Sequence, residues 1–324
     1  MDYKPKLFEL PPDGTWSGAH DYPPYVFNDD IAIAVDVALA TNRPLLIAGP
    51  PGSGKSMLAP AMAGLLGWRY LRHTLTSRSR LEELTGEADH LRRLHDAQAA
   101  RPGETFPPDW YYRKPGLLWW AFSPETAARR GATSAEIQRL SAPFVEPDRP
   151  RGFNDQVANT VILLDEIDKA EPDLPNDLLE PLDRMSFQVP NGPRVDAATE
   201  LRLLVVITTN GERELPPAFL RRCISLVLGD PDENRLKNIA AHHYPKRDYP
   251  KLDRSLFGAV AARVIEQQKS AKDSGQRPPS TSEYLDALRA CDRLGIDPEH
   301  PLWERISLAT LAKDSGIESE MGGI

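Results

Sequence analysis

One octapeptide has the residue types and the spacing of a phosphate-binding loop. It reads GPPGSGKS over residues 49–56 and matches the Walker A pattern G-x-x-x-x-G-K-[ST] in full. Glycines allow such a loop to turn its backbone N–H groups inward around an anion, and the following helix adds its partial positive charge. We therefore predict that nucleotide phosphates are bound by Gly49, Pro50, Pro51, Gly52, Ser53, Gly54, Lys55, Ser56 and Met57.

Two acids at the end of an apolar run provide the complementary chemistry. The segment VILLDE, residues 161–166, is typical of a buried strand and ends in Asp165 and Glu166. Ligands bind at the carboxyl ends of strands in open α/β sheets. We predict that Lys55 contacts the β- and γ-phosphates of ATP, and that Ser56 and Asp165 hold Mg²⁺, the latter through water. Glu166 then orients and polarises the attacking water. The structural alternative is a pair of acids that caps the next helix.

Three further polar residues complete the candidate catalytic set. Asn210 ends another apolar run, LLVVITTN, where its amide can position the same water molecule. Arg221 and Arg222 lie in LPPAFLRRC, after an expected helix and too far around the sheet to reach their own nucleotide easily. An arginine that reaches a neighbouring subunit's nucleotide accelerates phosphoryl transfer by about 10³–10⁵-fold. A solvated pair bridged to surface acids is the alternative for these arginines.

A parallel sheet with helices on both faces is the scaffold that would bring these residues together. Apolar runs predict buried strands at residues 43–49, 161–166 and 201–210, and residues 68–75 are predicted to form a further strand. Helical spacing between and around them predicts helices at residues 27–39, 56–67, 81–98 and 174–185. The alternation of strand, turn and helix indicates an α/β fold with a three-layer αβα core.

The pattern changes near residue 229, where the predicted strands stop. Four segments with helical spacing follow, at residues 236–244, 255–271, 281–295 and 301–314. We therefore divide the chain into an N-terminal arm (1–24), a core that carries the phosphate loop (25–229) and a small all-helical second domain with the C-terminal tail (230–324). The arm is rich in Pro, Gly and Asp and is expected to lie over the surface.

The composition argues against several other classes of protein. Hydrophobic residues make up 40% and charged residues 27% of the 324 residues, as in ordinary soluble globular proteins. A net charge of −8 argues against broad electrostatic capture of nucleic acid. No apolar segment approaches the length of about 20 residues that a membrane span needs, and the N-terminus lacks a secretion signal. We expect a cytoplasmic protein without a membrane span.

The motifs taken together resemble an AAA+ ATPase, and within that group the MoxR family. The order of the phosphate loop, the strand ending in DE (Walker B), the sensor-1 asparagine Asn210 and the LPPAFLRRC region is that of the family. Residues 84–120 resemble its helix-2 insert. On this resemblance Arg222 is the arginine finger that acts in trans, with Arg221 as the second choice.

The resemblance has two departures. Asp168 and Lys169 replace the commoner Asn and Arg of the family's DEINRA segment. The pair still consists of one polar and one basic residue. Many relatives carry a sensor-2 arginine at the start of a lid helix, and Glu283 stands at the aligned position here. Either another arginine such as Arg289 reaches the nucleotide, or sensor 2 is absent.

The resemblance implies a homo-oligomer, a ring that is most commonly hexameric, with ATP and Mg²⁺ at each subunit junction. Such ATPases use the energy to remodel protein clients, often with a partner that carries a von Willebrand A domain. The resemblance also implies that the core (25–229) is the ATPase and that the helical domain from about residue 230 is a lid, which would move against the core on nucleotide binding and hydrolysis.

Two other functions compete with this interpretation. A nucleic-acid motor is favoured by basic and aromatic residues in and near the insert, although acids at five positions nearby dilute the charge. These basic and aromatic residues are Arg78, Arg80, Arg92, Arg93, Trp110, Tyr111, Tyr112, Arg113, Lys114, Trp119 and Trp120. The same aromatic residues would also suit packing against the core. A small-molecule kinase also uses a phosphate loop, but the adjacent acids and the helical domain fit it poorly.

Overall fold

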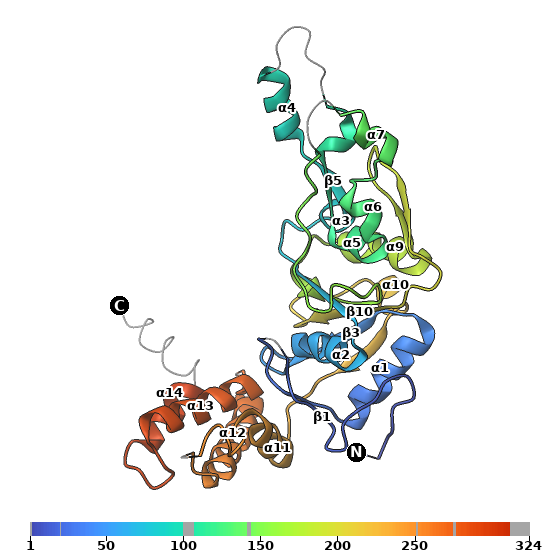
Figure 1. The fold of residues 1–324 in the computed structure, drawn as a ribbon. Helices are drawn as coiled ribbons and strands as arrows, with labels where there is room; N and C mark the ends of the chain where they lie inside the picture. Colours follow the sequence, from blue (N-terminus) through green and yellow to red (C-terminus); the bar gives the residue numbers. More distant parts are fainter. Residues whose placement is uncertain are drawn as a thin grey trace.

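A parallel sheet forms the centre of the molecule. The computed structural model describes residues 2–19, 21–99, 107–140, 144–250, 252–274 and 277–311. Within those residues the sheet has five strands in the order β11–β3–β10–β7–β4, and every neighbouring pair is parallel (Figure 1). The strands are β3 (Leu45–Ala48), β4 (Arg69–Thr74), β7 (Thr160–Asp165), β10 (Leu203–Thr209) and β11 (Ile224–Val227). The four predicted strands are confirmed. The edge strand β11, with only four residues, was not predicted.

Alternating side chains of the strands build a separate core on each face of the sheet. On β3, Leu45 and Ile47 pack with α1 (Asp29–Thr41) and α2 (Leu58–Leu66), whereas Leu46 belongs to the opposite cluster. Helices of that second cluster include α3 (Leu81–Thr85), α5 (Leu117–Phe122), α8 (Leu174–Asp177) and α9 (Leu179–Arg184). Successive side chains of a strand point to opposite faces, so one apolar run feeds both cores. The predicted three-layer αβα core is confirmed.

Local signals in the sequence set the ends of the helices beside the sheet. The side chain of Asn28 accepts a hydrogen bond from the Ile31 N–H at 2.9 Å and caps the start of α1. The left-handed Gly67 (φ 65°) ends α2. Pro60 lies in the first turn of α2, where the N–H that proline lacks would have no helical partner.

The N-terminal segment, predicted as an arm over the surface, places some of its side chains in the hydrophobic core. Its strand β1 (Thr15–Trp16) pairs antiparallel with β2 (Tyr25–Val26). Phe8 and Trp16 are each only 7% exposed and belong to the same cluster as α1 and α2. The carboxylate of Asp36 on α1 also accepts hydrogen bonds from the Tyr3 hydroxyl and from the N–H groups of residues 6 and 7.

The helix predicted continuously over residues 81–98 is wrong. It is interrupted by strand β5 (Gly86–Ala88) and resumes as α4 (His90–Ala99). Gly86 has a φ of 152°, and β5 pairs antiparallel with β6 (Arg113–Pro115). A glycine at positive φ ends a helix, and the hydrogen bonds to β6 replace those of the helix. The amphipathic pattern concealed the break because it continues on both sides of a single glycine.

Short elements connect these parts. The predicted helix over residues 174–185 is present as α8 and α9, which meet at Leu178. A hairpin follows that was not predicted. The remaining short elements are 3-10 turns η1 (Lys55–Met57), η2 (Asp109–Tyr112) and η3 (Ile167–Lys169), helices α6 (Pro124–Ala128), α7 (Ser134–Gln138) and α10 (Pro217–Leu220), and hairpin strands β8 (Ser186–Gln188) and β9 (Arg194–Asp196).

The C-terminal helices have a hydrophobic cluster of their own and lie away from the insert (Figure 1). They are α11 (Glu233–His243), α12 (Ser255–Ser274), α13 (Thr281–Leu294) and α14 (Trp303–Leu311). The helices predicted after residue 229 are therefore present, and residues 312–314 of the last one lie outside the described residues. Among the described helices, none combines the length and the apolar character that a membrane crossing needs.

Candidate nucleotide site

The phosphate loop follows β3 directly and depends on glycine for its shape. Gly52 and Gly54 adopt φ values of 79° and 91°, and Gly49 has a φ of 158°. Residues with a side chain rarely adopt the left-handed conformations of Gly52 and Gly54. The loop leads into the turn η1 and then into α2, so the predicted order of strand, loop and helix is confirmed.

Lys55 folds back across the loop. Its side chain is buried, and its Nζ donates hydrogen bonds to the carbonyl oxygens of Gly49 at 2.7 Å and Pro50 at 2.8 Å. Burial lowers the pKa of Lys55, and the charges of nearby acids, Asp165 foremost, oppose that shift. A buried ammonium is stabilised by neighbouring negative charge, so this environment suits a bound phosphate.

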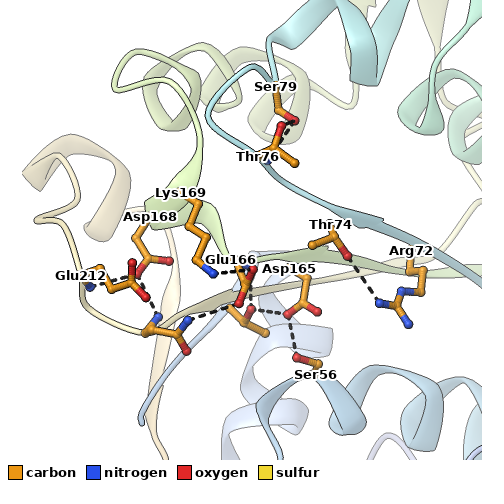
Figure 2. Close-up of polar contacts among 12 residues, drawn as sticks. Ser56, Arg72, Thr74, Thr76, Ser79, Asp165, Glu166, Asp168, Lys169 and Glu212 are labelled. Atoms are coloured by element: carbon orange, nitrogen blue, oxygen red, sulfur yellow. Dashed lines mark hydrogen bonds and ion pairs between the residues drawn. The ribbon is translucent and has the colours of Figure 1, made fainter. Parts of the chain in front are cut away.

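Ser56 and Asp165 come together although 109 positions separate them in the chain. The Ser56 hydroxyl donates to Oδ1 of Asp165 at 2.7 Å, and Figure 2 shows the two side chains facing each other. The Thr208 hydroxyl on β10 donates to the same oxygen at 2.6 Å. Mg²⁺ prefers oxygen ligands such as hydroxyls and carboxylates, and the phosphates of a nucleotide usually supply further ligands. The residues present therefore fit a magnesium ion. The described residues include no cluster of three or more His, Cys, Asp or Glu that could hold a metal without the nucleotide.

Glu166 lies beside this pair in a left-handed conformation (φ 62°, ψ 53°). Its N–H donates to the Thr208 hydroxyl at 2.9 Å. Its carboxylate accepts hydrogen bonds from the Asn210 amide at 3.4 Å and from Lys169 Nζ at 3.0 Å. The hydrogen bond to Glu166 raises the pKa of Lys169. The structure thus brings Glu166 and Asn210 together, as a shared water molecule requires.

Asp168 holds the end of β10 in place. Its side chain is 3% exposed, and Oδ2 accepts hydrogen bonds from the N–H groups of Asn210 at 3.1 Å and Glu212 at 3.0 Å (Figure 2). Sequence reasoning assigned no role to Thr208, Asp168 or Lys169. In the sequence, Asp168 and Lys169 stand out only as a departure from the family pattern, and Thr208 resembles any other residue of a buried strand.

The comparison with known families agrees with this geometry. Residues 44–223, more than half of the chain, match the AAA domain of the dynein-related subfamily. The chain belongs to this AAA family. Comparison with curated proteins finds none that matches it. An AAA domain is in general an ATPase domain that binds nucleotide, and such domains typically assemble into rings.

The two candidate finger residues lie near the amino-terminal ends of the strands, whereas the phosphate loop lies at their carboxyl ends. Arg221 and Arg222 come just before β11, which runs parallel to β3 so that its far end pairs with Ala48 next to the loop. Both side chains are exposed. Arg222 forms an ion pair with Asp183 at 2.6 Å, and Arg43 donates hydrogen bonds to the backbone carbonyls of both arginines. The structure does not bring either arginine to the chain's own loop.

Glu283 caps a helix. Its side chain is 7% exposed, its Oε2 accepts from the Ser280 N–H at 2.7 Å, and its Oε1 pairs with Arg277 at 3.4 Å. The start of α13 also contacts the phosphate loop, because the N–H and the hydroxyl of Ser282 donate to the Gly52 carbonyl at 3.2 and 3.3 Å. The alternative candidate, Arg289, pairs with Asp286 of its own helix at 3.7 Å.

A cavity of about 420 Å³ adjoins the phosphate loop of the AAA domain. Its walls come from residues 23–26, the loop, the end of β11, α11 and the start of α13. Ligand pockets of this size, about 300–1,000 Å³, accommodate small molecules. Met57, predicted to contact nucleotide, is among the lining residues. Burial lowers the pKa of His243, another lining residue.

The basic and aromatic residues of the insert contact one another. Arg92 lies 4.8 Å from the centre of the Tyr111 ring, and Arg130 lies 5.2 Å from it. Trp119 and Trp120 are buried in the core. Two other basic residues form ion pairs with acids, Arg93 with Asp109 and Lys114 with Asp89. These contacts match the packing interpretation of the aromatic residues and leave fewer of them for stacking on nucleic-acid bases.

Proposed function

We propose that this AAA domain hydrolyses ATP as a MoxR-type remodelling ATPase that works as a ring, hexameric by resemblance, on protein clients. The observation that carries the proposal is one site in which the buried Lys55, the Ser56–Asp165 pair and the Glu166–Asn210 pair meet. Phosphoryl transfer needs little covalent chemistry from the protein, so this combination of charge and positioning is sufficient for it.

Each residue has a distinct role in the proposed reaction. Lys55 binds the β- and γ-phosphates, and Ser56 and Asp165 hold the magnesium ion. When bound, that ion neutralises charge that develops on the phosphates. Asn210 and Glu166 orient the attacking water, and Glu166 accepts its proton. Lys169 is the counter-ion of Glu166 at rest.

A neighbouring protomer supplies the remaining positive charge in this proposal. Arg222, or Arg221 in its place, precedes β11 at the amino-terminal end of the strands, away from the chain's own phosphate loop, so it reaches a nucleotide only on a neighbouring protomer. This position supports a head-to-tail assembly, which forms a ring where the rotation between protomers closes. The helices after residue 229 form the proposed lid. The protein client and a von Willebrand A partner rest on the resemblance to MoxR proteins.

The hydrolytic role is tested by removing the proposed base alone. Glu166→Gln should keep ATP binding and reduce turnover by about 10²–10⁴-fold, the usual contribution of a general base. Glu180→Gln is the matched control, because Glu180 is an exposed acid that pairs with Arg184 on the next turn. Lys55→Ala should instead weaken nucleotide binding itself. If Glu166→Gln still hydrolyses ATP as fast as the wild type, Glu166 is not the base.

The trans arrangement is tested by mixing two inactive proteins. Arg222→Ala protomers keep an intact phosphate site, and Glu166→Gln protomers keep an intact finger, so mixed rings should recover part of the ATPase activity. Arg184→Ala, a change of another exposed arginine, is the control and should remain active alone. Failure to recover activity in demonstrated mixed rings would contradict the trans role. Purified protein that stays monomeric, with an ATP turnover per protomer that does not rise with protein concentration, would contradict assembly.

A further inference from the structure

Thr208 connects the two acids of the site. Its side chain is completely buried near the end of β10, a central strand of the sheet, between β3 and β7. The hydroxyl donates to Oδ1 of Asp165 at 2.6 Å and accepts from the N–H of Glu166 at 2.9 Å. One oxygen therefore contacts both the proposed metal-binding acid and the residue that carries the proposed base.

A hydroxyl at this position has a cost that packing does not explain. The preceding residues of β10, Leu203–Ile207, are all apolar, and valine has nearly the shape of threonine. Burying a hydroxyl is unfavourable unless it forms hydrogen bonds. The hydroxyl of Thr208 forms one hydrogen bond with each of the two acidic residues, Asp165 and Glu166. The hydroxyl thus serves the site more than it serves the core.

The two hydrogen bonds constrain different features of the site. Asp165 Oδ1 accepts from Thr208 and from Ser56, so Thr208 sets the direction from which the carboxylate meets Ser56. A left-handed conformation in a residue other than glycine is costly and persists only where its surroundings hold it. The hydrogen bond from the Glu166 N–H to Thr208 helps to hold that conformation, which determines where the Glu166 side chain begins.

We propose that Thr208 is a positioning residue that couples metal binding to the placement of the base. This inference rests on the proposed function of the site. Residues that orient metal ligands typically contribute about 10- to 100-fold to metal affinity or activity. Thr208→Val removes the hydroxyl with little change in volume, and Thr208→Ser keeps it. Thr209→Val is the matched control, since the Thr209 hydroxyl accepts from the Gly211 N–H and is buried on the same strand.

The decisive measurement is nucleotide affinity as a function of magnesium, which requires no turnover. We expect Thr208→Val to bind a fluorescent ATP analogue normally in EDTA and to need about 10- to 100-fold more Mg²⁺ for the tighter binding of the wild type. Thr208→Ser should restore much of this response, and Thr209→Val should match the wild type. Turnover of Thr208→Val should fall in parallel.

Three outcomes separate the possibilities. If the wild type shows no magnesium-dependent binding, the proposed function of the site fails. If the wild type does and Thr208→Val responds to Mg²⁺ equally well, only the role of Thr208 fails. A second comparison covers poor folding of the valine variant: in an Asp165→Ala background, Thr208→Ser and Thr208→Val should have the same Mg²⁺ response, because the carboxylate that the hydroxyl orients is gone. A difference that persists there would overturn the coupling.

Discussion

The contact between the phosphate loop and α13 can be tested by adding one methyl group to Gly52. A Cβ at this position would lie 2.3 Å from the Ser280 Oγ and 2.9 Å from its Cβ, closer than non-bonded atoms approach. Gly54→Ala is a matched control, because Gly54 is also left-handed but a Cβ there would meet nothing nearer than the Tyr25 ring at 3.7 Å. Both variants share a backbone strain of about 1–3 kcal/mol, so their difference isolates the contact with α13.

The expected difference follows from the hydrogen bonds that join the two elements. Ser282 donates two hydrogen bonds to the Gly52 carbonyl, each with a net stabilisation of about 0.5–1.5 kcal/mol. Losing both amounts to about 1–3 kcal/mol, a factor of about 5–150 in the opening equilibrium of the contact. Amide hydrogen exchange reports such local opening.

The assay compares exchange at residues 281–285 in nucleotide-free protein. These amides should exchange about 5–150-fold faster in Gly52→Ala, whereas Gly54→Ala should keep the wild-type rates there. Nucleotide affinity is unsuitable as the readout, since both glycines belong to the loop itself. Equal exchange at residues 281–285 in the two variants would refute the reasoning, because the shared strain would then account for the whole effect.

Three further changes test the packing and the site. Gly64→Ala would bring a Cβ to 2.5 Å from the indole of Trp16 and should lower the melting temperature. Gly258→Ala meets nothing within 4 Å in α12, so it should stabilise the protein by up to about 1 kcal/mol; equal melting temperatures would contradict this contrast. Lys169→Met removes the ion pair to Glu166 and should raise basal ATP turnover without changing the Michaelis constant for ATP, and steady-state kinetics showing slower turnover would contradict a resting counter-ion role.

Local patterns in the sequence were sufficient for the phosphate loop and for most elements of the fold. The glycines and Lys55 of the loop are adjacent in the chain, and their conformation depends on backbone freedom that only glycine provides. The apolar runs that form β3, β7 and β10 are buried on both faces, so their composition alone marks them. The helices after residue 229 have a period that does not depend on their neighbours.

The same local reasoning failed where distant segments decide the conformation. The helix over residues 81–98 has a suitable pattern, but pairing between β5 and β6 breaks it. The edge strand β11 exists because β3 offers it a hydrogen-bonding partner, and Glu283 acts as a helix cap at a position where the resemblance suggested an arginine.

The candidate site shows the same division. The types of its residues were evident from the sequence, since hydroxyl, carboxylate and amide groups end buried strands. Their mutual contacts depend on the order of strands in the sheet, which places β10 between β3 and β7. That order puts the Thr208 hydroxyl against Asp165 and Glu166, residues more than 40 positions away in the chain. The sequence by itself therefore determined which groups are present, and the tertiary structure alone decided which of them touch, because hydrogen bonds depend on distance in space and not along the chain.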